Sequence, residues 1–361
     1  LQFFMGIVAT FIIHFLLSFI ISAAINFDGS VAGEIILSGF LDALSLGLSL
    51  YAGLYIVQKA IVNEKVSNTD EGRESSSNQK EAKERKHKTV MEVFNSSFSF
   101  SKPLSQLIAT LSLLSLVYLP MDCITYLIPG VYEYQSEVLL QTTVGKYFNF
   151  NPIWKMVLTA FIYHFFVALR EEMYFRNYNL TIGDNTLKRN TSYLYSAILF
   201  SLAHFSYIFS PVTINYSLAF PFLWAVNSLI IGFASAYYLQ ETGKIWPIII
   251  AHWLNNAISS LSTRFFLDNK PFEFMFFRVY LPFFIVGVVL VVAYRKTYLR
   301  HIKMFFAKFK GYIAECKEYY DEYREPEPLR TKDLVKSDTS QGLDDLGGSP
   351  TKPGSRKKKK K

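Results

Sequence analysis

Long apolar stretches dominate the pattern of hydrophobic and polar positions along the chain. Eight of them, each about 18 residues long or more, are nearly free of Asp, Glu, Lys and Arg. A helix of that length crosses the roughly 30 Å hydrocarbon core of a bilayer, whereas core helices of soluble proteins are shorter and keep a polar face. The stretches lie near residues 3–25, 34–57, 104–128, 152–175, 192–209, 218–239, 245–262 and 279–294.

This pattern predicts an all-α integral membrane protein with about eight transmembrane helices, and it excludes a soluble enzyme. The composition agrees, since 51% of the 361 residues are hydrophobic and only 18% are charged. The two cysteines, Cys123 and Cys316, are too few for a disulfide scaffold or for a Cys-rich zinc or iron–sulfur site.

The placement of positive charge predicts the sidedness of the protein. Nine Lys and Arg residues lie within 58–102, and eighteen follow residue 294. By the positive-inside rule both segments are cytoplasmic. Because six predicted spans separate them, an even number, the two assignments agree and place both termini in the cytoplasm. Nothing in the sequence marks an organellar destination, so we expect a prokaryotic plasma membrane.

The same features divide the chain into five parts. The charged linker and the tail lack the apolar content of a core, and we expect the tail to be disordered. The parts are two N-terminal transmembrane helices at 1–57, a cytoplasmic charged linker at 58–103, a six-helix membrane core at 104–294, an amphipathic cytoplasmic helix at 295–325 and a basic tail at 326–361.

Apolar residues recur at spacings of three and four along 299–323 and form one seam on a charged helix. Two explanations stay open: a helix that lies on the inner leaflet, or a short coiled coil that makes a homo-oligomer. We expect the five final lysines to contact anionic membrane lipid. Nucleic acid and simple solubility are the alternatives for these lysines, although we expect no nucleic-acid partner. The seam consists of Leu299, Ile302, Phe306, Phe309, Ile313, Cys316, Tyr320 and Tyr323.

Ionisable side chains inside a membrane span cost about 2.5–3.5 kcal/mol at the bilayer centre, so they mark candidate functional positions. The fourth span ends in Arg170-Glu171-Glu172, and Arg176 follows four residues after Glu172. Residues four apart share a helical face, so Glu172 and Arg176 are able to pair, while Glu171 lies about 100° away without that partner. A pair of interfacial acids that reach into water is the alternative explanation.

Two further spans carry polar side chains. His204 follows Phe200 by one turn, and Asn256 follows His252 by one turn. Each pair alone is as well explained by hydrogen bonds between helices. Together with Glu171 they form a set suited to water activation and carbonyl attack in a cavity open to the cytoplasm. The other intramembrane polar positions are Asp42, Asp122, His14 and His164, of which we expect His164 to be a packing residue.

These residues follow the order E-E-x-x-x-R, F-x-x-x-H and H-x-x-x-N on separate spans. In this respect the segment 152–262 resembles the CPBP family of intramembrane proteases, also called the Abi or type II CAAX prenyl endopeptidase family. The resemblance implies an endopeptidase that hydrolyses a peptide bond near the cytoplasmic membrane face. The alternatives are a non-catalytic scaffold or immunity protein that uses the same cavity to bind a peptide or partner, and, with less support, a proton-coupled transporter.

The resemblance also implies roles for the individual residues. Glu171 activates the attacking water and His204 assists, while His252 and Asn256 donate to the oxyanion, and Glu172 and Arg176 hold the shape of the site. The implied substrate is a peptide or protein that is lipidated in the eukaryotic branch. We expect no cofactor. Zinc bound by Glu171, His204 and His252 is the alternative, although no H-E-x-x-H sequence is present.

Overall fold

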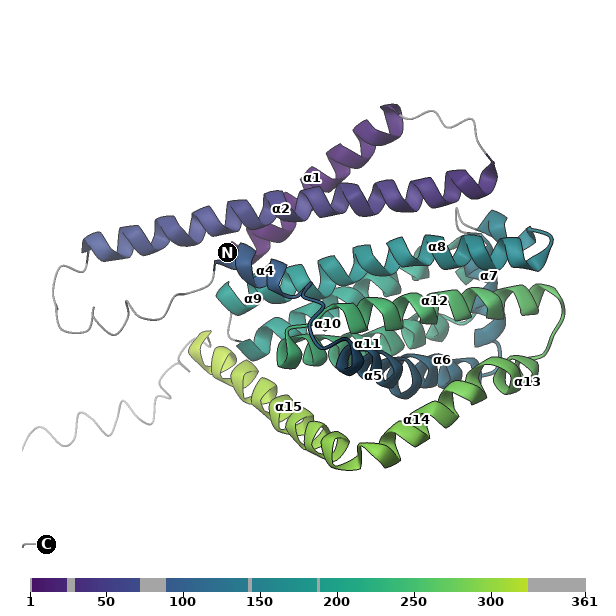
Figure 1. The fold of residues 1–361 in the computed structure, drawn as a ribbon. Coiled ribbons are helices and arrows are strands. Elements are labelled where there is room, and N and C mark those ends of the chain that lie inside the picture. The colour runs from purple at the N-terminus through teal and green to yellow at the C-terminus, as the bar shows by residue number, and fades with distance from the viewer. Residues whose placement is uncertain (1, 25–29, 72–88, 142–144, 187–188, 324–361) are drawn as a thin grey trace, which may run out of the picture. The chain divides into compact units, whose positions relative to one another are not determined.

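The computed structural model of the protein describes residues 2–24, 30–71, 89–141, 145–186 and 189–323. Over these ranges every element is helical (Figure 1), which confirms the predicted all-α fold. The α-helices are α1 (Gln2–Ala24), α2 (Val31–Glu71), α4 (Val90–Ser96), α5 (Pro103–Leu113), α6 (Leu119–Tyr126), α7 (Val131–Leu140), α8 (Ile153–Glu171), α9 (Asn179–Thr186), α10 (Arg189–Phe205), α11 (Ala219–Thr242), α12 (Trp246–Leu267), α13 (Phe272–Met275), α14 (Leu281–Ala293) and α15 (Arg295–Tyr323).

Shorter turns of other helix types connect several of these helices. Three are π-helical: η1 (Leu114–Tyr118), η3 (Glu172–Tyr178) and η6 (Phe276–Tyr280). Three are 3-10 turns: η2 (Gly145–Asn149), η4 (Ser206–Phe209) and η5 (Pro211–Asn215). The π-helical turns continue their neighbouring α-helices, so α5 to α6, α8 to α9 and α13 to α14 each form one longer helical segment.

All eight predicted spans fall on helices. In the described parts of the chain, six segments are long and apolar enough to cross a membrane. The predicted first and seventh spans are not among them: the apolar helix found within α1 covers only Met5–Ile20, and α12, with 22 residues, carries several polar side chains. The membrane character of the protein is thereby supported, while the full count of eight and the sidedness of the termini stay predictions.

The helices that carry the predicted site pack against one another. Helix α8 packs on α12, α10 packs on α11, and η3 touches both α10 and α11 (Figure 1). A Cβ added to Gly232 of α11 would lie 3.1 Å from the Cα of Ala197 in α10. Small residues therefore let these two backbones approach closely, as is typical of membrane helix pairs.

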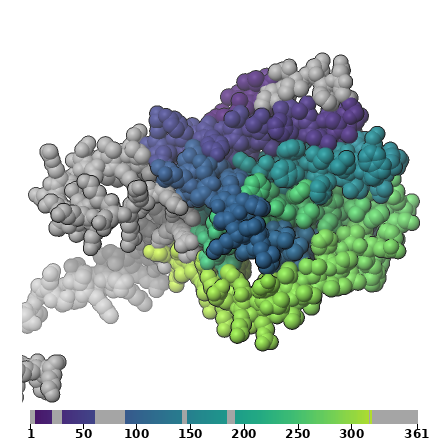
Figure 2. Space-filling model, in the orientation of Figure 1, coloured from purple at the N-terminus to yellow at the C-terminus, as the bar shows by residue number. Residues whose placement is uncertain are grey.

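The two N-terminal helices cover one side of this group. Helix α2 packs along α8 on the side away from α12, and α1 packs on α2 and reaches α9 (Figures 1 and 2). The hydroxyl of Tyr178 donates to the backbone carbonyl of Gly6, at 2.8 Å. Segments more than 150 residues apart in the sequence therefore form one side of the candidate site.

Part of the predicted linker 58–103 belongs to the folded core. Thr89 caps α4 in a capping box with Glu92, and Phe94 is fully buried against α2 and η3 residues. The backbone carbonyl of Phe98 accepts a hydrogen bond from the indole N–H of Trp246 at the start of α12, at 2.8 Å. The charged composition of the whole segment concealed this short apolar pattern. Residues 72–88 lie outside the described residues.

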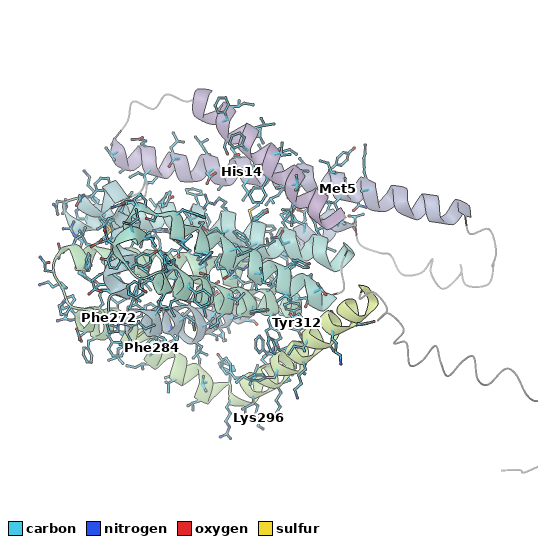
Figure 3. The ribbon with its side chains drawn as sticks, turned by 180° about the vertical axis from the view of Figure 1, so that it is seen from behind. Met5, His14, Phe272, Phe284, Lys296 and Tyr312 are labelled. Carbon is cyan, nitrogen blue, oxygen red and sulfur yellow. The ribbon has the colours of Figure 1, made fainter. Side chains whose placement is uncertain are left out.

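The chain divides after Glu315 into two units, and only the end of α15 is described in the second one. Within the first unit, Tyr312 lies on α15 (Figure 3), and its ring packs edge-on against Tyr193. Lys308 of the same helix forms an ion pair with Glu241. The predicted apolar seam lies on another face of α15. Its described side chains are 43–60% exposed, namely Leu299, Ile302, Phe306, Phe309 and Ile313.

The remaining seam residues, Cys316, Tyr320 and Tyr323, lie outside the described side chains, as does the predicted tail at 326–361. An exposed apolar face on a basic helix suits both explanations of the seam, a leaflet surface and a second copy of the chain. Both explanations stay predictions.

Candidate active site

The end of α8 places two adjacent acids in different surroundings. The helix becomes π-helical at Glu172, where η3 begins, and such turns are frequent at functional sites because they change the direction of the side chains. The Glu172 side chain is fully buried, whereas that of Glu171 is 17% exposed. One acid therefore faces the protein interior and the other can reach a cavity.

Glu172 and Arg176 form the enclosed pair, as we name it from here on. Arg176 Nε lies 3.1 Å from Glu172 Oε2, and neither side chain is exposed. The spacing of four residues predicted this contact, and it is present. The guanidinium also rests on the ring of Phe200, with its central carbon 3.6 Å from the ring centroid. A cation over an aromatic face is attracted to it, so Phe200 completes the surroundings of Arg176.

Phe200 also links the enclosed pair to His204. The two rings lie 4.4 Å apart, and His204 Nδ1 lies 2.9 Å from the backbone carbonyl of Phe200. A carbonyl oxygen only accepts hydrogen bonds, so Nδ1 carries the proton and donates. The other ring nitrogen, Nε2, of a neutral His204 then keeps its lone pair for a water or a proton. The contact between the two rings gives a physical reason for an aromatic residue four positions before His204.

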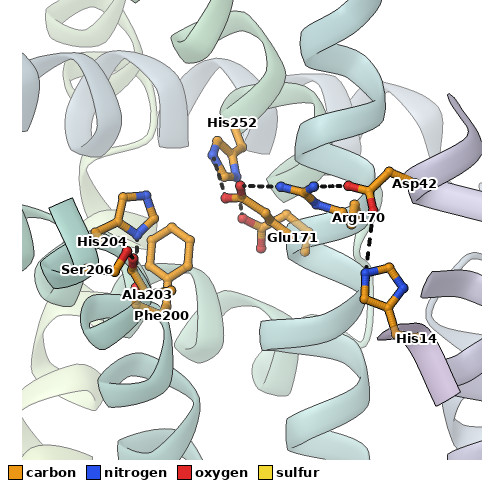
Figure 4. Close-up of polar contacts among 10 residues, drawn as sticks. His14, Asp42, Arg170, Glu171, Phe200, Ala203, His204, Ser206 and His252 are labelled. Atoms are coloured by element: carbon orange, nitrogen blue, oxygen red, sulfur yellow. Dashed lines mark hydrogen bonds and ion pairs between the residues drawn. The ribbon is translucent and has the colours of Figure 1, made fainter. Parts of the chain in front are cut away.

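His252 lies between the two acids of α8 and η3. Its Nδ1 lies 2.6 Å from Glu172 Oε1, and its Nε2 lies 3.7 Å from Glu171 Oε2 (Figure 4). A carboxylate also only accepts, so Nδ1 donates to Glu172. Nε2 can donate a second hydrogen bond only when both ring nitrogens of His252 carry a proton. The role of His252 as an oxyanion donor stays a prediction.

Glu171 has a partner that sequence analysis did not assign. Arg170 Nη2 lies 3.3 Å from Glu171 Oε1, and Arg170 Nη1 pairs with Oδ2 of Asp42 on α2. We call Asp42 and Arg170 the open pair, because both side chains are about one-third exposed. His14 of α1 contacts the other oxygen of Asp42 (Figure 4). Asp42 and His14 stood out only as polar residues inside predicted spans, since the sequence does not show which helices are neighbours.

Glu171 and His204 line one cavity of about 320 Å³. Helix α1 supplies part of its wall through Thr10, Phe11 and His14, and aromatic rings make up much of the remainder. The complete lining is Thr10, Phe11, His14, Leu46, Arg170, Glu171, Tyr174, Phe175, Ala203, His204, Ser206 and Tyr207. The structure thus brings the predicted base and its predicted assistant to one hollow, from two different helices.

Asn256 is the predicted site residue that these contacts do not reach. It is partly exposed, and its backbone carbonyl accepts from the Ser260 hydroxyl at 3.0 Å. Like His252, Glu172 and Arg176, it does not belong to the cavity lining given above. Its role as an oxyanion donor stays a prediction. His164 contacts the hydroxyls of Tyr147 and Ser260 at 2.9 and 2.6 Å, as expected of a packing residue.

Comparison with known families gives this geometry a context. Residues 152–258 match the family model of type II CAAX prenyl endopeptidase Rce1-like proteins. This segment is therefore similar to that family. The match confirms the resemblance seen in the motifs. Neither a curated protein nor a solved structure matched the chain in the corresponding comparisons.

The matched segment covers less than a third of the chain but contains all six predicted site residues: Glu171, Glu172, Arg176, His204, His252 and Asn256. The open pair joins this segment to a residue outside it, since Asp42 lies on α2. Helix α1 is also outside the matched residues, although it forms part of the cavity wall.

The expectation of no cofactor and the zinc alternative both stay predictions. In the parts of the chain that the structure describes, no three His, Cys, Asp or Glu residues form a group that could hold a metal ion. In the described arrangement Glu171, His204 and His252 are not grouped as three ligands of one ion. His252 already directs one ring nitrogen to Glu172 and the other toward Glu171. We assign no step of the reaction to a metal.

Proposed function

We propose that this protein is an intramembrane endopeptidase in which Glu171 activates a water molecule for attack on a peptide carbonyl. The observation that carries the proposal is the shared cavity of Glu171 and His204. Their side chains come from α8 and α10, and the hydrogen bond of His204 to Phe200 leaves Nε2 free. A carboxylate and an imidazole with a free lone pair that line one cavity can act as a general base and its assistant.

The proposed reaction has two steps. In the first, a water molecule gives a proton to the Glu171 carboxylate, its oxygen bonds to the carbonyl carbon, and the carbonyl oxygen becomes an oxyanion. His252, as an imidazolium, donates from Nε2 to that oxyanion, and Asn256 is proposed as a second donor. In the second step the C–N bond breaks, and the proton passes to the leaving nitrogen through Glu171 or His204. A carboxylic acid and an amine result.

The enclosed pair and Phe200 act on this reaction through His252. Glu172 fixes the direction of the His252 ring, and Arg176 compensates the charge of Glu172 inside the helix group. A buried carboxylate without such a partner would be very costly. We propose that these residues keep Nε2 of His252 directed at Glu171, so that donor and base stay on one side of the substrate carbonyl.

We further propose that the substrate is a peptide or protein with a lipid-modified cysteine near its C-terminus. The Rce1-like family supports this substrate class, and aromatic and aliphatic side chains of the cavity, among them Phe11, Leu46 and Phe175, suit an apolar chain. Cleavage near the cytoplasmic face follows from the charge distribution of the sequence.

The test uses the full-length protein, purified in detergent, and a quenched fluorescent peptide that ends in a farnesylated CaaX sequence. We expect cleavage after the modified cysteine, and a loss of about 100-fold or more in kcat for Glu171→Gln, as is typical when a general base is removed. Glu273→Gln serves as the matched control, since Glu273 is an exposed acid on α13. Treatment with a chelator is expected to leave the rate unchanged.

Four outcomes would contradict the proposal in different ways. Full activity of Glu171→Gln would remove the assigned base, and full inhibition by the chelator, reversed by zinc, would require a metal-dependent reaction. If the unmodified peptide is cleaved as fast as the farnesylated one, the lipid-modified substrate class is wrong. A biological effect that persists in both Glu171→Gln and His204→Ala would favour the non-catalytic scaffold.

A further inference from the structure

Arg170 is shared unequally between two acids. One terminal nitrogen pairs with Asp42, while the other lies 3.3 Å from Glu171 Oε1. A charge-assisted N–H···O contact is usually about 2.7–2.9 Å long, so the contact with Glu171 is a weak one. The guanidinium is therefore directed mainly at Asp42.

Asp42 is itself held from two helices. Its Oδ1 lies 3.4 Å from His14 Nε2 on α1, while Oδ2 faces Arg170. His14 Nδ1 lies 3.0 Å from the hydroxyl of Ser45, which is also 3.0 Å from that of Ser18. If His14 is neutral and donates from Nε2 to the carboxylate, Nδ1 accepts from Ser45. Both oxygens of Asp42 are thus occupied, which fixes the carboxylate opposite Arg170.

A guanidinium favours two parallel contacts with one carboxylate. Without Asp42, Arg170 could turn both terminal nitrogens toward Glu171 and form such a pair. Both oxygens of Glu171 would then be engaged, and the carboxylate would be less able to take a proton from water. Arg170 would therefore inhibit Glu171 as a base if its guanidinium turned fully toward the Glu171 carboxylate.

We propose that Asp42 is a positioning residue for Glu171, which holds the Arg170 guanidinium away from a two-point contact with the general base. Asp42 lies on α2, outside the matched Rce1-like residues. The N-terminal helices thus supply the residue that positions Arg170 relative to Glu171, as well as part of the cavity wall. The catalytic consequence rests on the proposed function, whereas the geometry of Arg170 can be tested without any substrate.

The first measurement is the rate at which dicyclohexylcarbodiimide, an apolar reagent for carboxyl groups, modifies Glu171 in the purified full-length protein, followed by mass spectrometry of peptides. We expect Asp42→Asn to slow this modification about threefold or more, since a two-point ion pair protects the carboxyl group. Adding Arg170→Gln to Asp42→Asn is expected to restore the rate. Asp42→Glu, which keeps the charge, should stay near wild type.

Glu34→Gln is the matched control, because Glu34 is an exposed acid in the first turn of the same helix. An unchanged modification rate in Asp42→Asn would overturn the proposal. A modification rate in the double variant that is lower still than in Asp42→Asn would also overturn the proposal. A purely structural role for Asp42 predicts this result, because the two substitutions would then each add to the damage. If Asp42→Asn aggregates, the double variant and Asp42→Glu decide the question by the same measurement.

The second measurement is cleavage of the farnesylated peptide. For Asp42→Asn we expect kcat to fall about tenfold with KM changed less than about twofold, the pattern of a lost transition-state contribution. Recovery of kcat when Arg170→Gln is added to Asp42→Asn supports the proposal. A change in KM alone in Asp42→Asn contradicts it. If the wild-type protein cleaves no peptide, the proposed function fails while the labelling result still decides the role of Asp42.

Discussion

Two arginine–carboxylate pairs lie at the same end of α8 and differ in their surroundings. The enclosed pair, Glu172 and Arg176, has no exposed side-chain surface, whereas Asp42 and Arg170 of the open pair are each about one-third exposed. A buried pair cannot lose one member without leaving an uncompensated charge, while an exposed pair is solvated when it opens. The enclosed pair is therefore suited to fixing the shape of the site, and the open pair to adjusting one reactive group.

The largest expected effect comes from breaking the enclosed pair. We expect Glu172→Gln to lower the free energy of unfolding by about 3–5 kcal/mol, because Arg176 then stays buried without its counter-charge. Arg170→Gln should cost less than about 1 kcal/mol, since the open pair is partly solvated. Thermal unfolding of the purified variants in detergent measures the difference. Equal losses in the two pairs would show that exposure does not separate them.

An intermediate effect is expected at Phe200, which lies under the Arg176 guanidinium. Phe200→Leu keeps an apolar side chain but removes the aromatic face, which we expect to cost about 1–2 kcal/mol. The backbone carbonyl that holds His204 is retained, so activity should fall less than in His204→Ala. Thermal unfolding and peptide cleavage measure the two effects, with Phe277→Leu, an exposed position, as the control. A wild-type stability for Phe200→Leu would contradict the cation–π contribution.

The smallest effect concerns α15, which is attached through partly exposed contacts like those of the open pair. The ring of His301 lies 3.2 Å from the Tyr237 hydroxyl, and burial lowers the pKa of His301 below its usual 6.5. Because the pKa of His301 is lowered while α15 is attached, His301 of a detached α15 binds its proton at a higher pH than His301 of an attached α15. The attachment should therefore be complete above about pH 6.5 and weaken below it.

Hydrogen exchange of the backbone amides of α15 at pH 7 and pH 5.5, corrected for the intrinsic rate, measures this change. Matched measurements on His301→Gln, which cannot take up the proton, serve as the control. The same loss of protection in both proteins would assign the effect to another group. Because the attachment also includes the Lys308–Glu241 pair, we expect a partial opening of α15 and no change in the cavity.

Composition and local spacing predicted much of this structure. The apolar stretches predicted every long helix of the core, and the spacing of four residues predicted the enclosed pair. Both depend on contacts within one helix, which a sequence displays directly. The exposed seam of α15 was also visible in its spacing, but the opposite attachment through Tyr312 and Lys308 was not, because that face mixes aromatic and charged residues.

Contacts between distant helices could not be predicted in the same way. Arg170 precedes the two acids of the motif, yet only the packing of α2 on α8 brings Asp42 to it. The cavity wall from α1 and the hydrogen bond between Phe98 and Trp246 of α12 also depend on the packing of segments that are distant in the sequence. The expected position of Asn256 in the site rests on its spacing from His252 alone, and the described contacts do not add to it.

The wall that α1 contributes has a consequence for engineering. A chimera that transplants only residues 152–258 into another membrane scaffold would carry the motif residues but leave out Thr10, Phe11 and His14 from one side of the hollow. Such a graft would open the pocket sideways to lipid and release Arg170 from Asp42 at the same time. The smallest transferable module of this enzyme candidate therefore includes both N-terminal helices, although no recognisable motif lies within them.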